Sequence, residues 1–150
     1  MISEFKNKYF FLSNFYRCSI IIDEKQWPTI EHIFQAAKTT DLDKREYIRN
    51  LKFPKEAKQY SKKIDLRSDW EKVKYDIMYG AVYFKFNQNK DLASKLISTN
   101  DQYLIEGNYR HDNIWGNCYC DECKNSKGQN LLGEILMKVR KDIWEEKYVK

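Results

Sequence analysis

Apolar residues recur every three or four positions near the C-terminal end of this 150-residue chain, and this periodicity constrains the fold more than any other feature. From Leu131 to Trp144 the pattern predicts an amphipathic helix, because residues with this spacing share one helix face. The predicted apolar face consists of Leu132, Ile135, Leu136, Val139 and Ile143. Such a helix must bury that face against other elements, so the chain must form a hydrophobic core.

The same kind of evidence predicts further helices along the chain. A long helix begins at Ser68, because Ser68 and Glu71 have the spacing of a capping box. Its expected buried stripe is Val73, Ile77, Ala81 and Phe84. Shorter helices are expected near Thr29 after Pro28, from Leu42 to Leu51, from Pro54 to Lys62, and around Leu92 and Leu96.

Strand signals are few. Cys18 to Ile22 and Lys25 to Trp27 surround the polar pair Asp23-Glu24, which predicts a short β-hairpin. A brief strand is expected from Tyr103 to Glu106, before a long polar segment over residues 107–129. The predicted fold class is therefore α+β, a mostly helical single domain over residues 1–150 with a small β-sheet.

The amino-acid composition excludes some classes of protein. Hydrophobic residues make up 42% and aromatic residues 15% of the chain, which excludes a compositionally disordered protein. A net charge of +5 suits ligands that carry phosphate. The first residues lack the apolar stretch of a signal peptide, and no run has the length of a membrane span. We therefore expect a cytoplasmic protein with no membrane partner.

One candidate site lies on the helix after Thr29. Glu31, Gln35 and Lys38 lie four and then three residues apart, so their side chains share one helix face. The stripe is either an ordinary solvated face or the polar lining of a cleft. The helix dipole stabilises the ionised form of Glu31 in the first turn, and Trp27 offers a stacking surface just before it.

A second candidate site lies in the polar segment. Asp112 is either a second carboxylate or the cap of a turn, and Trp115 is either a flat wall for a base or a core anchor. Farther on, Asn130 is a good helix N-cap, and the N–H groups of the helix that it begins suit a phosphate. A plain helix cap explains Asn130 equally.

Cysteines and lysines offer two more patterns. Cys118, Cys120 and Cys123 have ligand-like spacing, and His111 could complete a zinc site. Without a second Cys-x-x-Cys pair, we expect reduced thiols, no metal and no cofactor, and Cys18 is too distant in sequence for a disulfide framework. A basic run also occurs between residues 55 and 67. It either binds the phosphate of a nucleic acid or a nucleotide or forms a solvated helix face, and we favour the solvated face. The run consists of Lys55, Lys58, Lys62, Lys63 and Arg67.

A series of short motifs resembles the NADAR superfamily, which includes the YbiA-like N-glycosidases. The first half carries Phe11-Leu12-Ser13-Asn14-Phe15 and Trp27-Pro28-Thr29-x-Glu31-His32-x-Phe34-Gln35-Ala36-x-Lys38. The second half carries Trp70-Glu71-x-Val73-Lys74, Lys85-Phe86, Leu104-x-Glu106, Asp112-x-x-Trp115-Gly116 and Gly128-x-Asn130-x-Leu132-Gly133. The chain departs from the pattern at Tyr60-Ser61-Lys62-Lys63, where YbiA-like members tend to have a Gly-Arg pair, and lysine does not reproduce the bidentate grip of arginine on phosphate.

The resemblance implies a YbiA-like fold and hydrolysis of N-glycosidic bonds. Some members remove ADP-ribose from guanine in nucleic acid, and others cleave phosphoribosyl-amine intermediates of riboflavin synthesis. The first activity is expected here, with ADP-ribosylated nucleic acid as the partner and the second activity as the alternative. A module that binds ADP-ribose or NAD without cleaving it is the rival. A toxin counterpart, an ADP-ribosyltransferase, is not readable from the sequence.

The resemblance also assigns residues. It implies catalytic roles for Glu31, Lys38 and Asp112. The expected substrate-binding residues are Asn14, Phe15, Gln35, Trp115, Gly116 and Asn130. A carboxylate such as Glu31 can stabilise the positive charge that develops on ribose, whereas Lys38 can attack C1 of a ring-opened ribose to form a Schiff base. The sequence does not distinguish the two routes.

Overall fold

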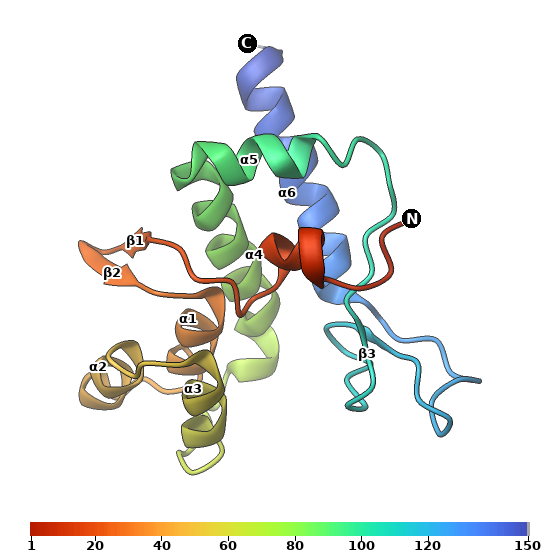
Figure 1. The fold of residues 1–150 in the computed structure, drawn as a ribbon. Helices are drawn as coiled ribbons and strands as arrows, with labels where there is room; N and C mark the ends of the chain where they lie inside the picture. The colour runs from red at the N-terminus through yellow and green to blue at the C-terminus, as the bar shows by residue number, and fades with distance from the viewer. Residues whose placement is uncertain (150) are drawn as a thin grey trace. The chain divides into compact units, whose positions relative to one another are not determined.

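The predicted helices occur in the predicted order in a computed structural model, which describes residues 1–149 (Figure 1). The internal contacts divide the chain into two units. One comprises Met1–Ser13 and the chain from Lys90 onward, and the other comprises Asn14–Asn89. The first thirteen residues therefore pack with the C-terminal part of the chain rather than with the segment that follows them.

The unit Asn14–Asn89 begins with the predicted hairpin. Strands β1 (Ile20–Ile22) and β2 (Lys25–Trp27) are antiparallel, with Ile20 opposite Trp27. Asp23 and Glu24 have φ values of 52° and 67°, the left-handed pair of a type I′ turn. The hairpin is confirmed, although its first strand begins at Ile20 rather than Cys18.

Helix α1 lies at the centre of this unit. It packs against the other three helices, and all of its residues are buried. The four helices are α1 (Ile30–Ala36), α2 (Leu42–Arg49), α3 (Pro54–Ser61) and α4 (Trp70–Gln88). Ala36, Ile48 and Ala57 form a small core against which Trp27 packs. Trp27, considered above as a stacking surface, therefore contributes to the core.

Helix α4 differs from the prediction in its start and its buried face. Asp69 is the N-cap and makes no side-chain capping bond, while Glu71 pairs with Lys74 at 2.5 Å, so the predicted capping box is wrong. Phe84, expected in the buried stripe, is 37% exposed. The buried residues are Trp70, Met78, Ala81, Val82, Lys85 and Phe86. Apolar and aromatic residues occur on several faces of this helix, so their spacing does not single out the packed one.

The other unit carries the second long helix. Helix α6 (Leu131–Tyr148) buries all five residues of the predicted apolar face, which confirms that prediction. Helix α5 (Lys90–Ile97) packs against it, and the unit also contains a 3-10 helix (Asn7–Leu12). The strand expected from Tyr103 to Glu106 is only an isolated bridge between Ile2 and Leu104. A parallel pair follows, formed by β3 (Gly107–Asn108) and β4 (Asn117–Cys118).

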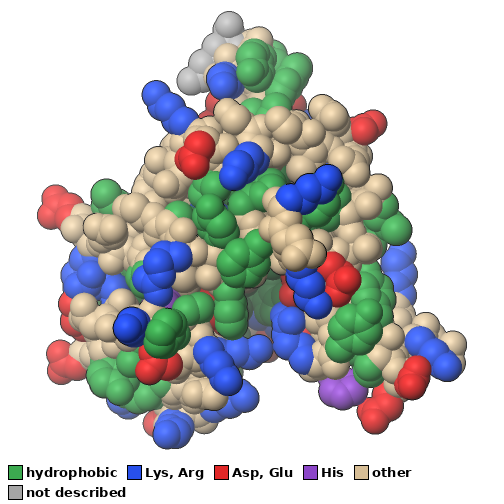
Figure 2. Space-filling view, in the orientation of Figure 1, with side chains coloured by type: hydrophobic (Ala, Val, Ile, Leu, Met, Phe, Trp, Pro, Cys, Tyr) green, Lys and Arg blue, Asp and Glu red, His purple; other side chains and the backbone are tan. Residues whose placement is uncertain are grey.

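The α+β, mostly helical fold class is confirmed, and the described part of the chain contains two small two-stranded sheets. On the face shown in Figure 2, lysine and arginine side chains are interspersed with carboxylates. Among residues 1–149, no helix combines the length and apolarity that crossing a membrane requires.

Candidate active site

The start of α1 is fastened to the segment before the hairpin. The Asn14 carbonyl accepts a hydrogen bond from the Glu31 backbone N–H at 3.1 Å. The Asn14 side-chain Nδ2 lies 3.6 Å from Met78 Sδ, and its Oδ1 is buried without a hydrogen-bond partner among the described residues. Phe15, the next predicted site residue, is half-buried. Asn14 and Glu31, predicted from separate motifs, therefore lie beside each other.

His32 positions this helix rather than offering a proton donor or acceptor to a ligand. Thr29 caps α1 by accepting a hydrogen bond from the His32 N–H, and its hydroxyl lies 2.7 Å from His32 Nδ1. His32 Nε2 lies 2.9 Å from the Leu51 carbonyl, which requires a proton on Nε2. Burial lowers the pKa of His32, so the neutral ring with both nitrogens occupied is the stable form.

Glu31 and Gln35 form a buried polar pair one helical turn apart. Gln35 Nε2 donates to Glu31 Oε1 at 2.6 Å, and the two side chains are 4% and 7% exposed, Gln35 being the more buried. Gln35 Oε1 has no hydrogen-bond partner within residues 1–149. A buried acceptor without a donor costs about 1–3 kcal/mol. The amide oxygens of Asn14 and Gln35 would therefore gain from a ligand that supplies hydroxyl or amine donors.

Helix α1 ends at Ala36, so Lys38 lies in the turn that follows the helix. It therefore does not lie on the helix face that was predicted to carry it together with Glu31 and Gln35. The Arg67 N–H donates to the Lys38 carbonyl at 2.8 Å and holds this turn. The Lys38 ammonium lies 5.6 Å from the ring centroid of Phe34 and 5.9 Å from that of Trp70. Burial is the main reason that the pKa of Lys38 is lowered. The charge of Glu31 opposes this shift, and Lys58 and Lys62 add to it.

A second perturbed lysine was not singled out from the sequence. Lys85 of α4 is fully buried, with its ammonium 5.3 Å from the ring centroid of Tyr16 and 5.2 Å from that of Phe86. Burial lowers its pKa to about 7. The sequence marked it only as part of the Lys85-Phe86 motif, because its burial depends on the fold.

In the other unit, Asp112 caps a turn, one of the two interpretations kept above. Its Oδ1 accepts hydrogen bonds from the N–H groups of Ile114 and Trp115 at 3.1 and 3.0 Å. Its Oδ2 lies 3.6 Å from Arg110 Nη2. The half-buried Trp115 is thus held through its backbone by Asp112. A catalytic role for Asp112 stays a prediction.

Glu106 is a half-buried carboxyl near Asp112 with a raised pKa. Arg110 Nη2 donates to its Oε1 at 2.8 Å and Asn108 Nδ2 to its Oε2 at 3.1 Å. Burial raises the pKa of Glu106, and the charge of Asp112 adds to this, while Arg110 opposes it. A raised pKa is the property that a general acid needs. The sequence marked Glu106 only as part of a motif, because its burial depends on the fold.

Gly116 permits a close approach to Glu106. A Cβ at this position would lie 2.0 Å from Glu106 Oε2 and 2.1 Å from the Glu106 carbonyl oxygen. The adjacent Asn117 N–H donates to that same carbonyl at 2.9 Å. Any side chain at Gly116 would therefore displace Glu106 or disrupt this pairing.

Asn130 is the N-cap residue of α6, but its side chain makes no capping bond. Its Nδ2 donates to the Leu104 carbonyl and its Oδ1 accepts from the Glu106 N–H, each at 2.9 Å. The N–H groups of Leu131 and Leu132 donate to the Ile114 and Trp115 carbonyls at 3.1 and 2.9 Å. These two donors are engaged within the protein, and a phosphate seat at this turn stays a prediction. Binding of substrate by Asn130 stays a prediction.

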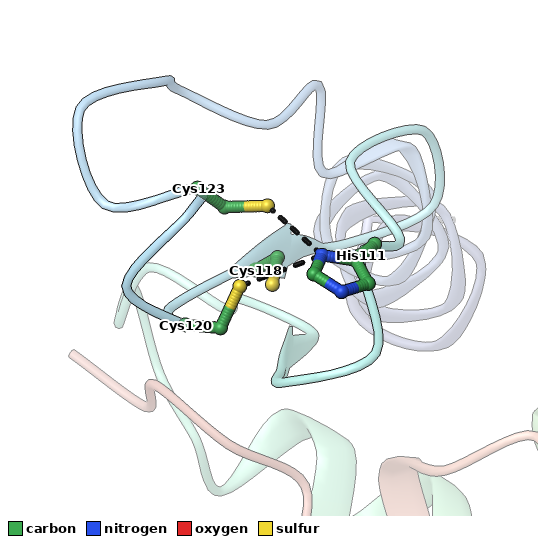
Figure 3. A group of neighbouring side chains, drawn as sticks. All are labelled: His111, Cys118, Cys120 and Cys123. Atoms are coloured by element: carbon green, nitrogen blue, oxygen red, sulfur yellow. Dashed lines mark hydrogen bonds between the residues drawn. The ribbon is translucent and has the colours of Figure 1, made fainter.

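A hollow of about 150 Å³ lies beside Asn130, lined also by Tyr103 and Glu134. Ligand pockets for small molecules usually measure about 300–1,000 Å³, so this hollow is too small for a dinucleotide-sized ligand. The same unit brings His111 together with Cys118, Cys120 and Cys123 (Figure 3). Among residues 1–149, these four side chains are placed so that they could hold a metal ion.

Comparisons with known proteins agree with the resemblance noted in the sequence. The model of the NADAR domain family matches residues 2–144. N-glycosidase YbiA of Shigella boydii serotype 4 is 38% identical over 137 residues, which cover 90% of this chain and 82% of that protein. The riboflavin biosynthesis protein VVA0006 of Vibrio vulnificus is 35% identical over 137 residues, but these cover 36% of its length.

The fold has a solved counterpart. The NMR structure of the Escherichia coli protein YbiA superimposes with a TM-score of 0.83 at 34% sequence identity. The match covers 98% of this chain and 89% of that protein. The similarity therefore includes both units.

Proposed function

The chain belongs to the NADAR domain family, and on that premise we propose that it hydrolyses the bond between C1 of a ribose and a nitrogen atom. The relatives named N-glycosidase support this activity. The observation that carries the proposal is the buried Glu31–Gln35 pair beside a lysine whose pKa is lowered.

The chemistry suits these groups. As the C1–N bond breaks, positive charge develops on the ribose ring, and a fixed carboxylate in a poorly hydrated site stabilises that charge strongly. Glu31 is such a carboxylate, oriented by Gln35. The two buried amide oxygens, Asn14 Oδ1 and Gln35 Oε1, supply acceptors for ribose hydroxyl groups.

Two routes are open to this set of groups. In the direct route, water attacks C1, the nitrogen leaves with a proton, and Glu31 stabilises the charge. In the covalent route, the neutral Lys38 amine attacks C1 of the ring-opened ribose and the nitrogen leaves. Water then hydrolyses the resulting Schiff base and regenerates the amine. The lowered pKa of Lys38 increases the neutral fraction and favours the covalent route.

For the substrate, we infer ADP-ribose attached to guanine in nucleic acid. The positive charges of Lys58 and Lys62 act on Lys38, so the end of α1 lies in a positive field that suits the diphosphate of ADP-ribose. The alternative is a ribosyl-amine intermediate of riboflavin synthesis. It draws support from the similarity to VVA0006, which is named a riboflavin biosynthesis protein.

A side-by-side hydrolysis assay tests the proposal. The full chain is incubated with an oligonucleotide ADP-ribosylated on guanine and, separately, with a ribosyl-amine pyrimidine. We expect release of ADP-ribose and restoration of the unmodified oligonucleotide. Cleavage of the pyrimidine substrate alone would replace the proposed substrate by the alternative. Tight binding of ADP-ribose with cleavage of neither substrate would refute the enzyme in favour of a binding module.

A further inference from the structure

Three thiols and an imidazole converge in the unit that contains α6. The Sγ atoms of Cys118, Cys120 and Cys123 and a ring nitrogen of His111 all lie within 4.8 Å of one another. His111 Nδ1 lies 3.4 Å from both Cys120 Sγ and Cys123 Sγ (Figure 3). The residues come from two segments, the turn after β3 and the chain that begins at β4.

These separations suit a tetrahedral metal ion. Zinc binds thiolate sulfur at about 2.3 Å and imidazole nitrogen at about 2.0–2.1 Å, which places neighbouring ligand atoms about 3.5–3.8 Å apart. We propose that His111, Cys118, Cys120 and Cys123 bind one zinc ion in a Cys₃His site. Two thiol-to-imidazole separations already approach the required distance, so small side-chain rotations suffice. Soft thiolate ligands with one imidazole favour zinc over hard cations such as magnesium or calcium.

The backbone holds the ligands where this site needs them. The Cys118 N–H donates to Asn113 Oδ1 at 2.8 Å, which ties the first thiol to the turn that carries His111. The Cys123 N–H donates to the Cys120 carbonyl at 3.0 Å, so these two cysteines share one tight turn. His111 has a φ of 66°, a left-handed conformation that is uncommon for residues other than glycine. Its side chain points toward the three sulfur atoms (Figure 3).

Reduced thiols without a metal explain this arrangement less well. Cys118 is buried, but Cys120 and Cys123 are only half-buried and His111 is exposed, so apolar packing does not account for the convergence of all four. A disulfide would use two of the sulfur atoms and leave the third with the imidazole unexplained. A metal ion uses all four groups at once.

The site would be structural. Four protein ligands leave no position for water or substrate, unlike a catalytic zinc. The ligands bracket the functional candidates of this unit, because His111 precedes Asp112, and Cys118 follows Trp115 and Gly116. Bound zinc would therefore fix the turn that presents Asp112 and Trp115. This inference does not depend on the proposed glycosidase activity.

Metal analysis of the full chain, purified under reducing conditions without chelators, tests the proposal. Elemental analysis is expected to find one zinc per chain in the wild type and in Cys18→Ser, the matched control whose cysteine lies in the other unit. Cys120→Ser and Cys123→Ser are expected to lose most of the zinc. Retention of one zinc per chain by both of these variants would overturn the assignment.

Cobalt substitution of the wild type covers the case in which a cysteine variant fails to fold. Wild-type protein stripped of metal is titrated with Co²⁺, and we expect the visible bands of tetrahedral cobalt together with thiolate charge-transfer absorption. A wild type that contains no zinc and shows neither band would overturn the proposal. So would a disulfide between Cys120 and Cys123 in protein kept under reducing conditions.

Discussion

The buried lysine of α4 makes the stability of the protein depend on pH. Lys85 exposes none of its surface, and burial lowers its pKa from 10.5 to about 7, while the nearby Cys18 opposes the shift. In the unfolded chain the side chain regains its ordinary pKa. Between these two values the unfolded state binds more protons than the folded state, so the free energy of unfolding rises with pH.

The size of this change in stability follows from the shift in the pKa of Lys85. Each unit of pKa difference corresponds to about 1.4 kcal/mol. For a folded pKa near 7, raising the pH from 7 to 9 should increase the free energy of unfolding by about 2 kcal/mol through Lys85 alone, and below pH 7 the destabilisation is essentially complete. Replacement of Lys85 by methionine keeps the length of the side chain and removes the titrating group.

Urea unfolding of the wild type and of Lys85→Met at pH 7 and pH 9 checks this prediction. The wild type should gain stability relative to Lys85→Met as the pH rises. Lys72→Met, a substitution at an exposed position of the same helix, should follow the wild type at both values. A constant difference between the wild type and Lys85→Met would show that Lys85 stays protonated in the folded protein and would refute the reasoning.

Two further predictions concern the candidate sites. If Lys38 acts as a nucleophile, borohydride added during turnover should leave a reduced ribosyl adduct on Lys38 in peptide mass spectra; normal turnover without an adduct would contradict the covalent route. Gly116→Ala places a Cβ 2.0 Å from Glu106 Oε2 and should lower the free energy of unfolding by about 1–3 kcal/mol in urea denaturation. The control, Gly80→Ala, meets no atom within 4 Å and should be neutral or stabilising, so equal effects of the two changes would contradict the steric argument.

Local sequence patterns correctly predicted the structural features that depend on residues close together in sequence. The spacing of apolar residues correctly predicted the buried face of α6, and Asp23-Glu24 correctly predicted the hairpin turn. Thr29 likewise predicted the start of α1. In each case the determining interaction spans no more than a few residues.

Features that depend on distant residues could not be predicted in this way. The pKa shifts of Glu106 and Lys85 arise from burial by other elements. Asn130 resembles a helix cap in sequence, but its side chain binds backbone groups of Leu104 and Glu106, some 25 residues away. The spacing of the cysteines was visible in the sequence, whereas their convergence on His111 depends on the path of the polar segment.

Glu31 illustrates what the sequence motifs and the structure each contribute. Spacing alone does not separate a catalytic stripe from a solvated one, so the catalytic role of Glu31 is a prediction that rests on the family motifs. The structure adds that Glu31 and Gln35 are buried and bonded to each other. It also shows that Lys38 lies beyond the helix end, because the chain turns at Ala37.

The kinetics of Glu31→Gln test the central claim most directly. Glutamine keeps the size of the side chain and an oxygen that can accept from Gln35 Nε2, so the fold should be preserved, but the negative charge is lost. On a ribosyl N-glycoside that the wild type cleaves, kcat should fall by about 10²–10³, the usual effect of removing one electrostatic contact to a transition state. Glu71→Gln, at a side chain that is 78% exposed, should keep wild-type activity. Full hydrolysis by a correctly folded Glu31→Gln variant would contradict the account.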